Sequence, residues 1–316
     1  MKKSLVILLV SIMVFGLAVT NVAAAYPEKP VQMIVAFSAG GGTDTAARTI
    51  AKYFKRYTDQ SLVVVNKPGG SGEVGFTQLA MAKTDGYTIG FLNTPHVVTP
   101  PIMRDTNFSL DSFVPIANIV TDPGVLVVRN DDQFEDLEAF IEYAKENPVD
   151  TASGAPGGDD HLAGLNIMDE TDAELNMVPF NGSSEQKSQL LGKHVDAGLM
   201  NASQVKSLVD SGDLKVLAVM AKKRSSYYPD APTFIEAGHE VISGSSRGIA
   251  APKGMSEEQI EILSDVFAKV VEDEDFLKEA ENLNLIMDYM PQEEYTDYLY
   301  GMHDRYSKMW ENNPWN

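Results

Sequence analysis

Cysteine is absent from all 316 residues, and after residue 25 no segment is long and apolar enough to cross a bilayer. Without cysteine the chain forms no disulfide, no thiol-ligated metal site and no lipid anchor on an N-terminal cysteine. The five histidines lack metal-ligand spacing. Basic residues are also scarce, with 25 against 45 acids and a net charge of −20. This balance disfavours nucleic acid and anionic membranes. We therefore expect no metal, no cofactor and no nucleic-acid partner.

The first 25 residues differ from the rest of the chain. Two lysines, Lys2 and Lys3, precede a mostly apolar run over Leu5–Val19, and three alanines end the segment at Ala25. This order is typical of a secretory signal peptide that is cut after the small residues. A membrane anchor is the alternative, but the run is shorter than the ~20 residues that a spanning helix needs. We expect a periplasmic protein whose mature chain begins at Tyr26.

The mature part alternates between strand-like and helix-like segments, which favours an α/β fold with largely parallel sheets. Its length and its 44% hydrophobic content indicate two domains of ordinary size. The predicted strands are 31–37, 62–66, 88–92, 125–128, 177–180, 216–220 and 248–251. The predicted helices are 44–57, 75–82, 134–146, 161–168, 184–191, 202–211, 256–271, 275–283 and 293–312.

A glycine loop between the first strand and the first helix is the strongest local signal. Such a turn can direct several backbone N–H groups at one point, where the helix dipole adds positive potential. It lacks the lysine of a phosphate loop and the spaced glycines of a dinucleotide site. We therefore predict an anion site here, although a plain tight turn is the alternative. Ser38 and Thr43 are predicted to contact the ligand directly, and Asp44 to cap the helix and order the loop. The predicted contacts are Ser38, Ala39, Gly40, Gly41, Gly42, Thr43 and Asp44.

Similar loops follow strands in the middle of the chain. Ligands of open α/β sheets bind at the carboxyl ends of strands, where loops enter helices. Ordinary turn chemistry is the alternative for each loop taken alone. Two acids, Asp159 and Asp160, would repel a carboxylate if they pointed inward, so we expect one of them to cap the following helix. The predicted contacts from this region are Ser153, Gly154, Gly157, Gly158, His161, Asn181, Ser183 and Asn201.

Arg247 is the predicted charged contact, because arginine binds carboxylates through two parallel hydrogen bonds. A salt bridge at a hinge is the alternative. The same segment, Gly244–Gly248, matches the G-x-S-x-G pattern of serine hydrolases, and His303 lies downstream of it. That motif needs a helix after the serine, whereas Ile249–Gly254 is typical of a strand and a turn. An exported hydrolase that uses Ser246 and His303 is therefore the weaker hypothesis.

Taken together, seven blocks along the mature chain resemble the substrate-binding proteins of tripartite tricarboxylate transporters, the Bug family. Their order and spacing are more specific than any one block. They are YPEKPVQMIVAFSAGGGTDTAAR, VVVNKPGGSGEVG, TDGYTIGFLN, GAPGGDDHLAG, VPFNGSSEQKSQLLGKHVDAGL, GDLKVLAVMAKKRSSYYPDAPTFIEAG and RGIAAPKGMSEEQIEIL.

The resemblance implies a bilobed periplasmic-binding-protein fold, type II-like, with two α/β domains joined by crossing strands. The first lobe would comprise 26–121 plus 248–316, and the second lobe 122–247. A small organic carboxylate would bind between Ser38–Asp44 and Ser153–His161, and hinge closure would follow without covalent chemistry. The protein would be a monomer and would deliver its ligand to integral membrane transporter subunits. Delivery to a membrane sensor is an alternative that the residues leave open.

Overall fold

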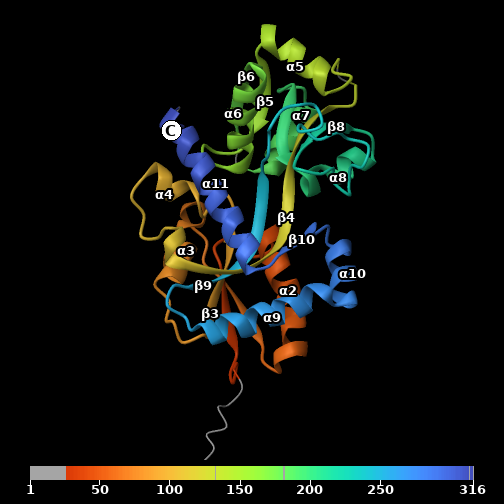
Figure 1. Ribbon diagram of the computed structural model, residues 1–316. Helices are drawn as coiled ribbons and strands as arrows, with labels where there is room; N and C mark the ends of the chain where they lie inside the picture. Colours follow the sequence, from red (N-terminus) through yellow and green to blue (C-terminus); the bar gives the residue numbers. More distant parts are fainter. Residues whose placement is uncertain (1–25, 132, 181, 313, 316) are drawn as a thin grey trace, which may run out of the picture.

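The computed structural model describes residues 26–131, 133–180, 182–312, 314 and 315. The predicted signal peptide lies outside the described residues. Strands and helices form two α/β lobes that are connected by the long strands β4 (Phe113–Arg129) and β9 (Gly244–Pro252), as Figure 1 shows. The bilobed α/β architecture expected from the sequence is confirmed. Among the described residues, none of the helices combines the length and the apolar character that a bilayer crossing requires.

The remaining strands are β1 (Val31–Val35), β2 (Leu62–Asn66), β3 (Thr88–Asn93), β5 (Val149–Ser153), β6 (Leu175–Pro179), β7 (Ala197–Asn201), β8 (Leu214–Met220) and β10 (Met287–Met290). The helices are α2 (Gly42–Thr58), α3 (Glu73–Ala80), α4 (Thr99–Met103), α5 (Leu137–Glu146), α6 (Asp159–Thr171), α7 (Ser183–Leu191), α8 (Ala202–Asp210), α9 (Glu257–Glu272), α10 (Glu274–Asn282) and α11 (Gln292–Asn312). Short 3₁₀ turns occupy Gly70–Gly72 and Leu110–Ser112. The sequence analysis did not predict β5, β7, β10 or α4.

Each lobe has its own set of parallel strands. In the first lobe the order is β2-β1-β3-β9-β4, with β1 parallel to both β2 and β3. In the second lobe β7, β5 and β6 are parallel neighbours, and β4 pairs with both β7 and β8. Because the parallel strands of a lobe share one direction, their carboxyl ends lie at one edge and the following loops gather there.

The two connecting strands pair with each other from Phe113↔Pro252 to Pro123↔Gly244. Beyond that point β4 changes partners, because Gly124 already pairs with Asn201 of β7 and with Met220 of β8. The passage between lobes therefore occurs at Pro123–Gly124 and Gly244. Both positions lie within Asn118–Val125 and Ser243–Ile249, where the family resemblance predicts the crossings.

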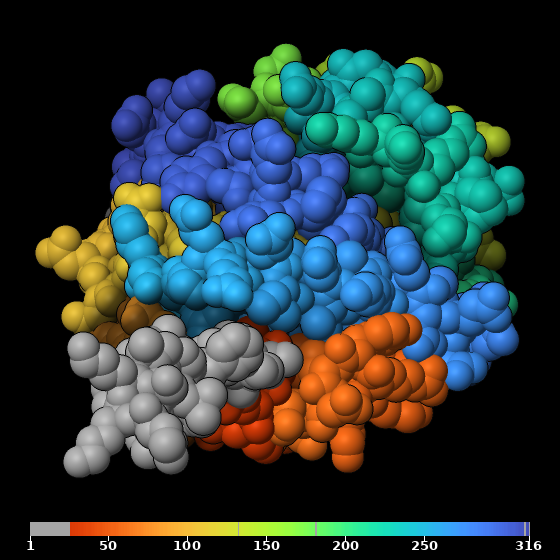
Figure 2. Space-filling view, turned by 60° about the horizontal axis from the view of Figure 1, so that its bottom comes forward, coloured from red at the N-terminus to blue at the C-terminus, as the bar shows by residue number. Residues whose placement is uncertain are grey.

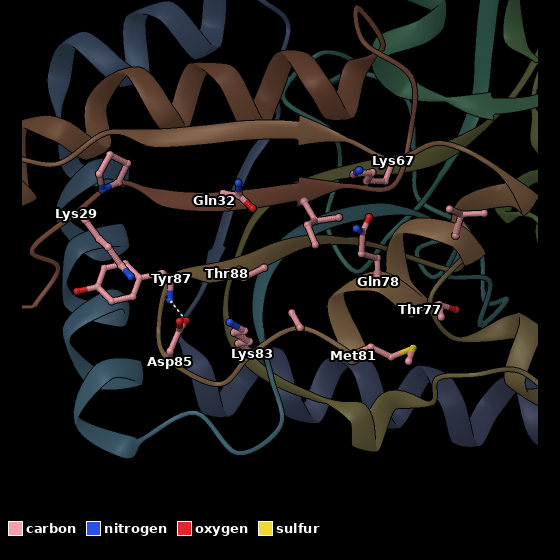
Figure 3. A pocket seen from close by; sticks show the side chains of 14 residues that line it. Lys29, Gln32, Lys67, Thr77, Gln78, Met81, Lys83, Asp85, Tyr87 and Thr88 are labelled. Carbon is pink, nitrogen blue, oxygen red and sulfur yellow. Dashed lines mark hydrogen bonds between the residues drawn. The ribbon is translucent and has the colours of Figure 1, made fainter.

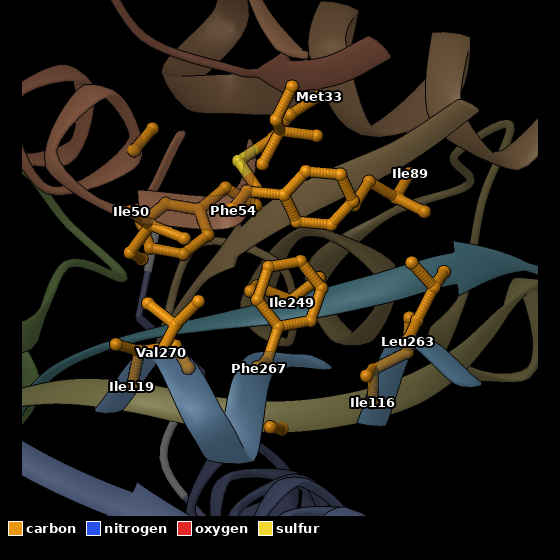
Figure 4. Close-up of a cluster of buried hydrophobic side chains, with 14 of the residues drawn as sticks. Met33, Ile50, Phe54, Ile89, Ile116, Ile119, Ile249, Leu263, Phe267 and Val270 are labelled. Carbon is orange, nitrogen blue, oxygen red and sulfur yellow. The ribbon is translucent and has the colours of Figure 1, made fainter. Parts of the chain in front are cut away.

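The core of the first lobe lies between the sheet and helices α2 and α9. Figure 4 shows Phe54 of α2 and Phe267 of α9 meeting between Met33, Ile249 and other aliphatic side chains. The two rings lie 5.6 Å apart and are both fully buried. A separate apolar cluster forms the core of the second lobe, around Phe140, Leu199 and Phe234. Each lobe therefore has a hydrophobic core of its own.

The C-terminal helix α11 runs from the first lobe toward α6 of the second (Figure 1). In Figure 2, α9, α10 and α11 form a continuous blue band between α2 and the second lobe. Tyr306 and Trp315 share one buried cluster with Leu162 of α6, so the end of a segment assigned to the first lobe also contacts the second. The lobe boundaries inferred from the sequence remain a prediction.

Candidate functional site

The first glycine loop lies between β1 and α2. Gly40 has φ +83°, a backbone conformation that favours glycine, and Gly41 is the N-cap residue of α2. No side chain caps this helix. The N–H groups of its first turn have no partner within the helix, and they lie at the positive end of the helix dipole. The loop therefore offers backbone donors to an anion, as the sequence predicts.

Asp44 orders this loop from within. Its Oδ2 accepts hydrogen bonds from the Gly40 N–H at 2.8 Å and from Arg48 Nε at 2.9 Å. Its Oδ1 accepts a hydrogen bond from Asn66 Nδ2 at 2.9 Å. The predicted capping role is wrong in position, because the helix begins at Gly42 and Gly41 is the N-cap. The predicted role in loop order agrees with these bonds. With both oxygens engaged, the carboxylate is directed into the loop.

We expect Asp44→Asn to destabilise the protein by about 1–3 kcal/mol at pH 7, because hydrogen bonds to a charged group are lost. Burial raises the pKa of Asp44, but bonds from Arg48, Gly40 and Asn66 outweigh it and lower the pKa to about 2. The stabilisation is therefore present above the unfolded value of 3.8 and is lost as the pH falls toward 2.

Urea unfolding of the wild type and Asp44→Asn between pH 3 and pH 7 measures this effect. The difference in unfolding free energy should shrink as the pH is lowered. Asp105→Asn, at an exposed acid with no hydrogen bond of its own, is the matched control and should change little. A difference that stays constant across this pH range would contradict the assignment.

The end of β3 supplies residues that the sequence analysis missed. Asn93 is 4% exposed, and its Nδ2 donates a hydrogen bond to Thr43 Oγ1 at 2.8 Å. Its Oδ1 is buried without a hydrogen-bond partner. Burial lowers the pKa of His96, which packs against Phe37 with ring centroids 5.6 Å apart. Asn93 and His96 could have been identified by their position in the sequence, because both follow the carboxyl end of the predicted strand 88–92.

The second glycine loop has the same construction. Helix α6 begins at Asp159, Gly158 is the N-cap, and no side chain caps the helix. The prediction that Asp159 or Asp160 caps it is therefore wrong, since both lie inside the first turn. Asp159 Oδ2 accepts a hydrogen bond from Asn201 Nδ2 at 2.8 Å. Asp160 Oδ2 accepts one from Gln186 Nε2, also at 2.8 Å.

The buried acids carry less repulsion than their number suggests. Burial, with the nearby charge of Asp159, raises the pKa of Asp160 well above its ordinary value. Burial also raises the pKa of Asp122, whose carboxylate accepts hydrogen bonds from the backbone and the hydroxyl of Ser203. These carboxyls are bound to groups of their own lobe. The electrostatic repulsion of an anion between the two loops is therefore smaller than the number of acids implies.

The other predicted contacts of the second lobe differ in how deeply they are buried. Ser153 is fully buried at the end of β5, so its hydroxyl lies beneath the loop. His161 Nδ1 accepts a long hydrogen bond of 3.5 Å from the Gly157 N–H, and burial lowers its pKa. Ser183 is the first residue of α7. Asn181 lies outside the described residues.

The lobes already touch at the second loop. Thr99 Oγ1 of α4 donates a hydrogen bond of 3.1 Å to the Gly157 carbonyl. A Cβ built on Gly157, whose φ is +78°, would lie 3.0 Å from Met103 Sδ and 3.3 Å from Trp315 Nε1. The absence of a side chain at this position therefore allows the second loop to approach the first lobe closely.

Arg247 lies on β9, beside the first loop. A Cβ built on Gly42 would lie 3.5 Å from Arg247 Nη2, which places the guanidinium at the start of α2. Its Nε is buried without a hydrogen-bond partner, and no acid among the described residues forms an ion pair with it. The hinge salt bridge that the sequence left open is therefore not formed. A partly buried cation without an ion-pair partner is well placed to bind a ligand that supplies negative charge.

The serine hydrolase hypothesis fails on geometry. Ser246 is fully buried within β9, and its Oγ lies 2.9 Å from Thr94 Oγ1, so no sharp strand-to-helix turn exposes it. His303 is on α11, where its Nδ1 lies 3.5 Å from the neighbouring Asp304 carboxylate. Over the ranges that the structure describes, no cluster of three or more histidine or acidic side chains could hold a metal ion.

Comparisons with known proteins agree with this geometry. Residues 46–311 match the model of the tripartite tricarboxylate transporter family receptor. Protein BugT of Bordetella pertussis is 32% identical over 84% of this chain and 83% of its own length. A TctC solute-binding protein from Polaromonas has a TM-score of 0.84 and 32% identity, over 91% of this chain and 99% of its own. The periplasmic binding protein BugD has a TM-score of 0.72 and 28% identity, over 91% and 98%. The chain therefore belongs to the tripartite tricarboxylate transporter receptor family.

Proposed function

We propose that this protein binds a small organic carboxylate in the cleft between its lobes and delivers it to membrane subunits of a tripartite transporter. The observation that carries the proposal is Arg247, a partly buried cation that forms no ion pair with the described acids and lies at the start of the uncapped helix α2. Family membership supports delivery to a transporter rather than to a sensor. The protein would act in the periplasm as a monomer, after loss of residues 1–25.

In this proposal the ligand joins the two lobes. One carboxylate would accept hydrogen bonds from Arg247 and from the N–H groups of Gly41 and Gly42, with Ser38 and Thr43 beside them, because the Gly40 N–H is already bound to Asp44. The first turn of α6, which follows Gly157 and Gly158, would supply its N–H groups from the opposite side. Because these donors belong to different lobes, the ligand would favour the closed form by its differential affinity for it. No covalent step and no catalytic role are part of the proposal.

The test is thermal unfolding of the exported protein against a panel of mono-, di- and tricarboxylates, amines and neutral solutes. A ligand present at 100 times its Kd should add about 2.7 kcal/mol of stability and raise the Tm by several degrees. A response confined to carboxylates would support the proposal and name the ligand class. A response confined to amines would overturn it, because the acids of the second lobe would then be the contacts.

A further inference from the structure

A groove of about 930 Å³ lies on the first lobe, on the sheet face opposite α2 and α9. Its floor is a strip of open sheet, because Gln32 of β1 pairs with both Val63 of β2 and Thr88 of β3 and the three residues face the same side. Helix α3 forms one wall, with Val74, Thr77 and Gln78. Figure 3 shows Gln32 and Thr88 on the floor, between Lys29 and Tyr87 at one end and Lys67 near the other. This groove has no part in the cleft described above.

The lining of this groove is basic in a strongly acidic protein. Lys29, Lys67 and Lys83 line it, and Asp85 is the single acid in the lining. Asp85 Oδ1 already accepts a hydrogen bond from the Tyr87 N–H at 3.1 Å. Within the described part of the chain, none of the three lysines forms an ion pair. The groove therefore presents unneutralised positive charge, although the chain as a whole carries −20.

The rim of the groove is apolar and open. Val63 is 43% exposed, Val74 52% and Met81 77%. Exposed apolar side chains that gather beside polar ones mark surfaces for macromolecular partners. Strand β2 also ends the sheet, so its outer edge has no neighbouring strand. Such an edge can accept an extended segment of another chain.

The spacing of the lysines indicates which shape of ligand the groove can bind. Lys29 precedes β1, Lys67 follows β2, and the two five-residue strands are parallel and in register. The backbone positions of these lysines are therefore separated by more than the length of such a strand, about 16 Å. A single small anion cannot contact both ammonium groups, whereas an extended peptide of five to seven residues can.

We propose that this groove binds an acidic, extended segment of a protein partner. Its carboxylates would lie against Lys29, Lys67 and Lys83, and its alternate apolar side chains against Val74 and Met81. The partner is identified here by this chemistry alone, and the proposal does not depend on the ligand of the cleft.

The test uses a fluorescein-labelled eight-residue peptide of alternating Glu and Val, with fluorescence anisotropy as the readout. The wild type should bind this peptide saturably, and a matched Lys–Val peptide should not bind. The triple variant Lys29→Glu/Lys67→Glu/Lys83→Glu should raise the Kd at least tenfold. The control triple variant Lys222→Glu/Lys223→Glu/Lys269→Glu carries the same change in charge outside the groove and should stay within twofold.

Several results would overturn the proposal. No binding of the Glu–Val peptide, or equal weakening by both triple variants, would show that the groove is not a specific peptide site. Free glutamate that competes as well as the peptide would assign the groove to a small anion. Sedimentation that shows dimers lost in the groove variant would assign it to a second copy of this chain. An unchanged Tm in the groove variant keeps each comparison independent of folding.

Discussion

Replacement of Arg247 by Gln is expected to abolish the thermal response to carboxylates. The guanidinium lies beside the first glycine loop, buried at Nε and without an ion pair among the described residues. Truncating one member of a buried, hydrogen-bonded charge pair costs about 2–5 kcal/mol. The Kd for the carboxylate should therefore rise about 30-fold to several thousand-fold, since each 1.4 kcal/mol is a factor of ten. Isothermal titration of the ligand found in the panel measures this change.

Stability without ligand separates a binding role from a structural one. Because Arg247 forms no ion pair with the acids that the structure describes, its removal should leave the unliganded Tm unchanged or raise it. Arg247→Lys keeps the charge but loses the planar fork, so it should show an intermediate Kd. Arg104→Gln, at an exposed arginine paired with Glu73 at 2.7 Å, is the matched control. A large loss of unliganded stability in Arg247→Gln would instead indicate an undetected hinge salt bridge.

Replacement of Gly244 by Ala should be the most destabilising single methyl addition in the hinge. Gly244 has φ +149°, and a Cβ there would lie 2.5 Å from the Asp122 carbonyl oxygen and 2.8 Å from Pro123 Cα. These are backbone atoms of the paired strand, so they cannot rotate away as a side chain could. Overpacking costs typically 1–3 kcal/mol, and the backbone strain adds about 1–3 kcal/mol. We expect a loss of about 2–5 kcal/mol.

Chemical and thermal unfolding measure this loss, which corresponds to a fall in Tm of roughly 5–15 °C. Gly301→Ala is the control within the same chain, because no atom lies within 4 Å of a Cβ there and the residue is in helix α11. That variant should gain up to about 1 kcal/mol, since alanine favours helix more than glycine does. A Tm of Gly244→Ala within 2 °C of the wild type would show that β4 and β9 can separate at low cost.

The variants at Arg247 and Gly244 test different properties of the strand β9. Arg247 tests whether the cleft supplies charge to a ligand, and Gly244 tests whether the crossing strands constrain how the lobes meet. Both residues lie on β9, three positions apart, and β9 pairs with β4 through the passage between lobes. A ligand held by Arg247 therefore acts directly on the strand that connects the lobes.

Sequence reasoning succeeded where local chemistry decides the outcome. The glycine loops at 38–42 and 154–158 precede helices in the structure, because glycine permits the turn and leaves the helix N-terminus uncapped. It failed where local chemistry was misleading. Asp44, Asp159 and Asp160 resemble N-cap residues, yet each lies inside its helix and binds groups from other segments.

Other parts of the site could not be predicted because they depend on contacts between distant residues. Asn93 meets Thr43 across 50 residues, and Thr99 meets Gly157 across 58 residues. No periodicity or spacing in the sequence predicts such pairs, because they form only when segments that are far apart in the sequence become neighbours in the fold. Strand β5 was missed because its sequence, VDTAS, carries a weak apolar signal and is buried by its neighbours.

By itself, the amino-acid sequence determined the alternation of strands and helices and the two glycine loops that precede helices. These features depend on backbone sterics, helix dipoles and hydrophobic patterns that act over a few residues. Only the tertiary structure decided that Arg247 forms no ion pair with the described acids, that Asp122 and Asp160 bind groups of their own lobe, and that three lysines line one groove. Those properties depend on which distant segments come into contact, because charge is felt through space and not along the chain.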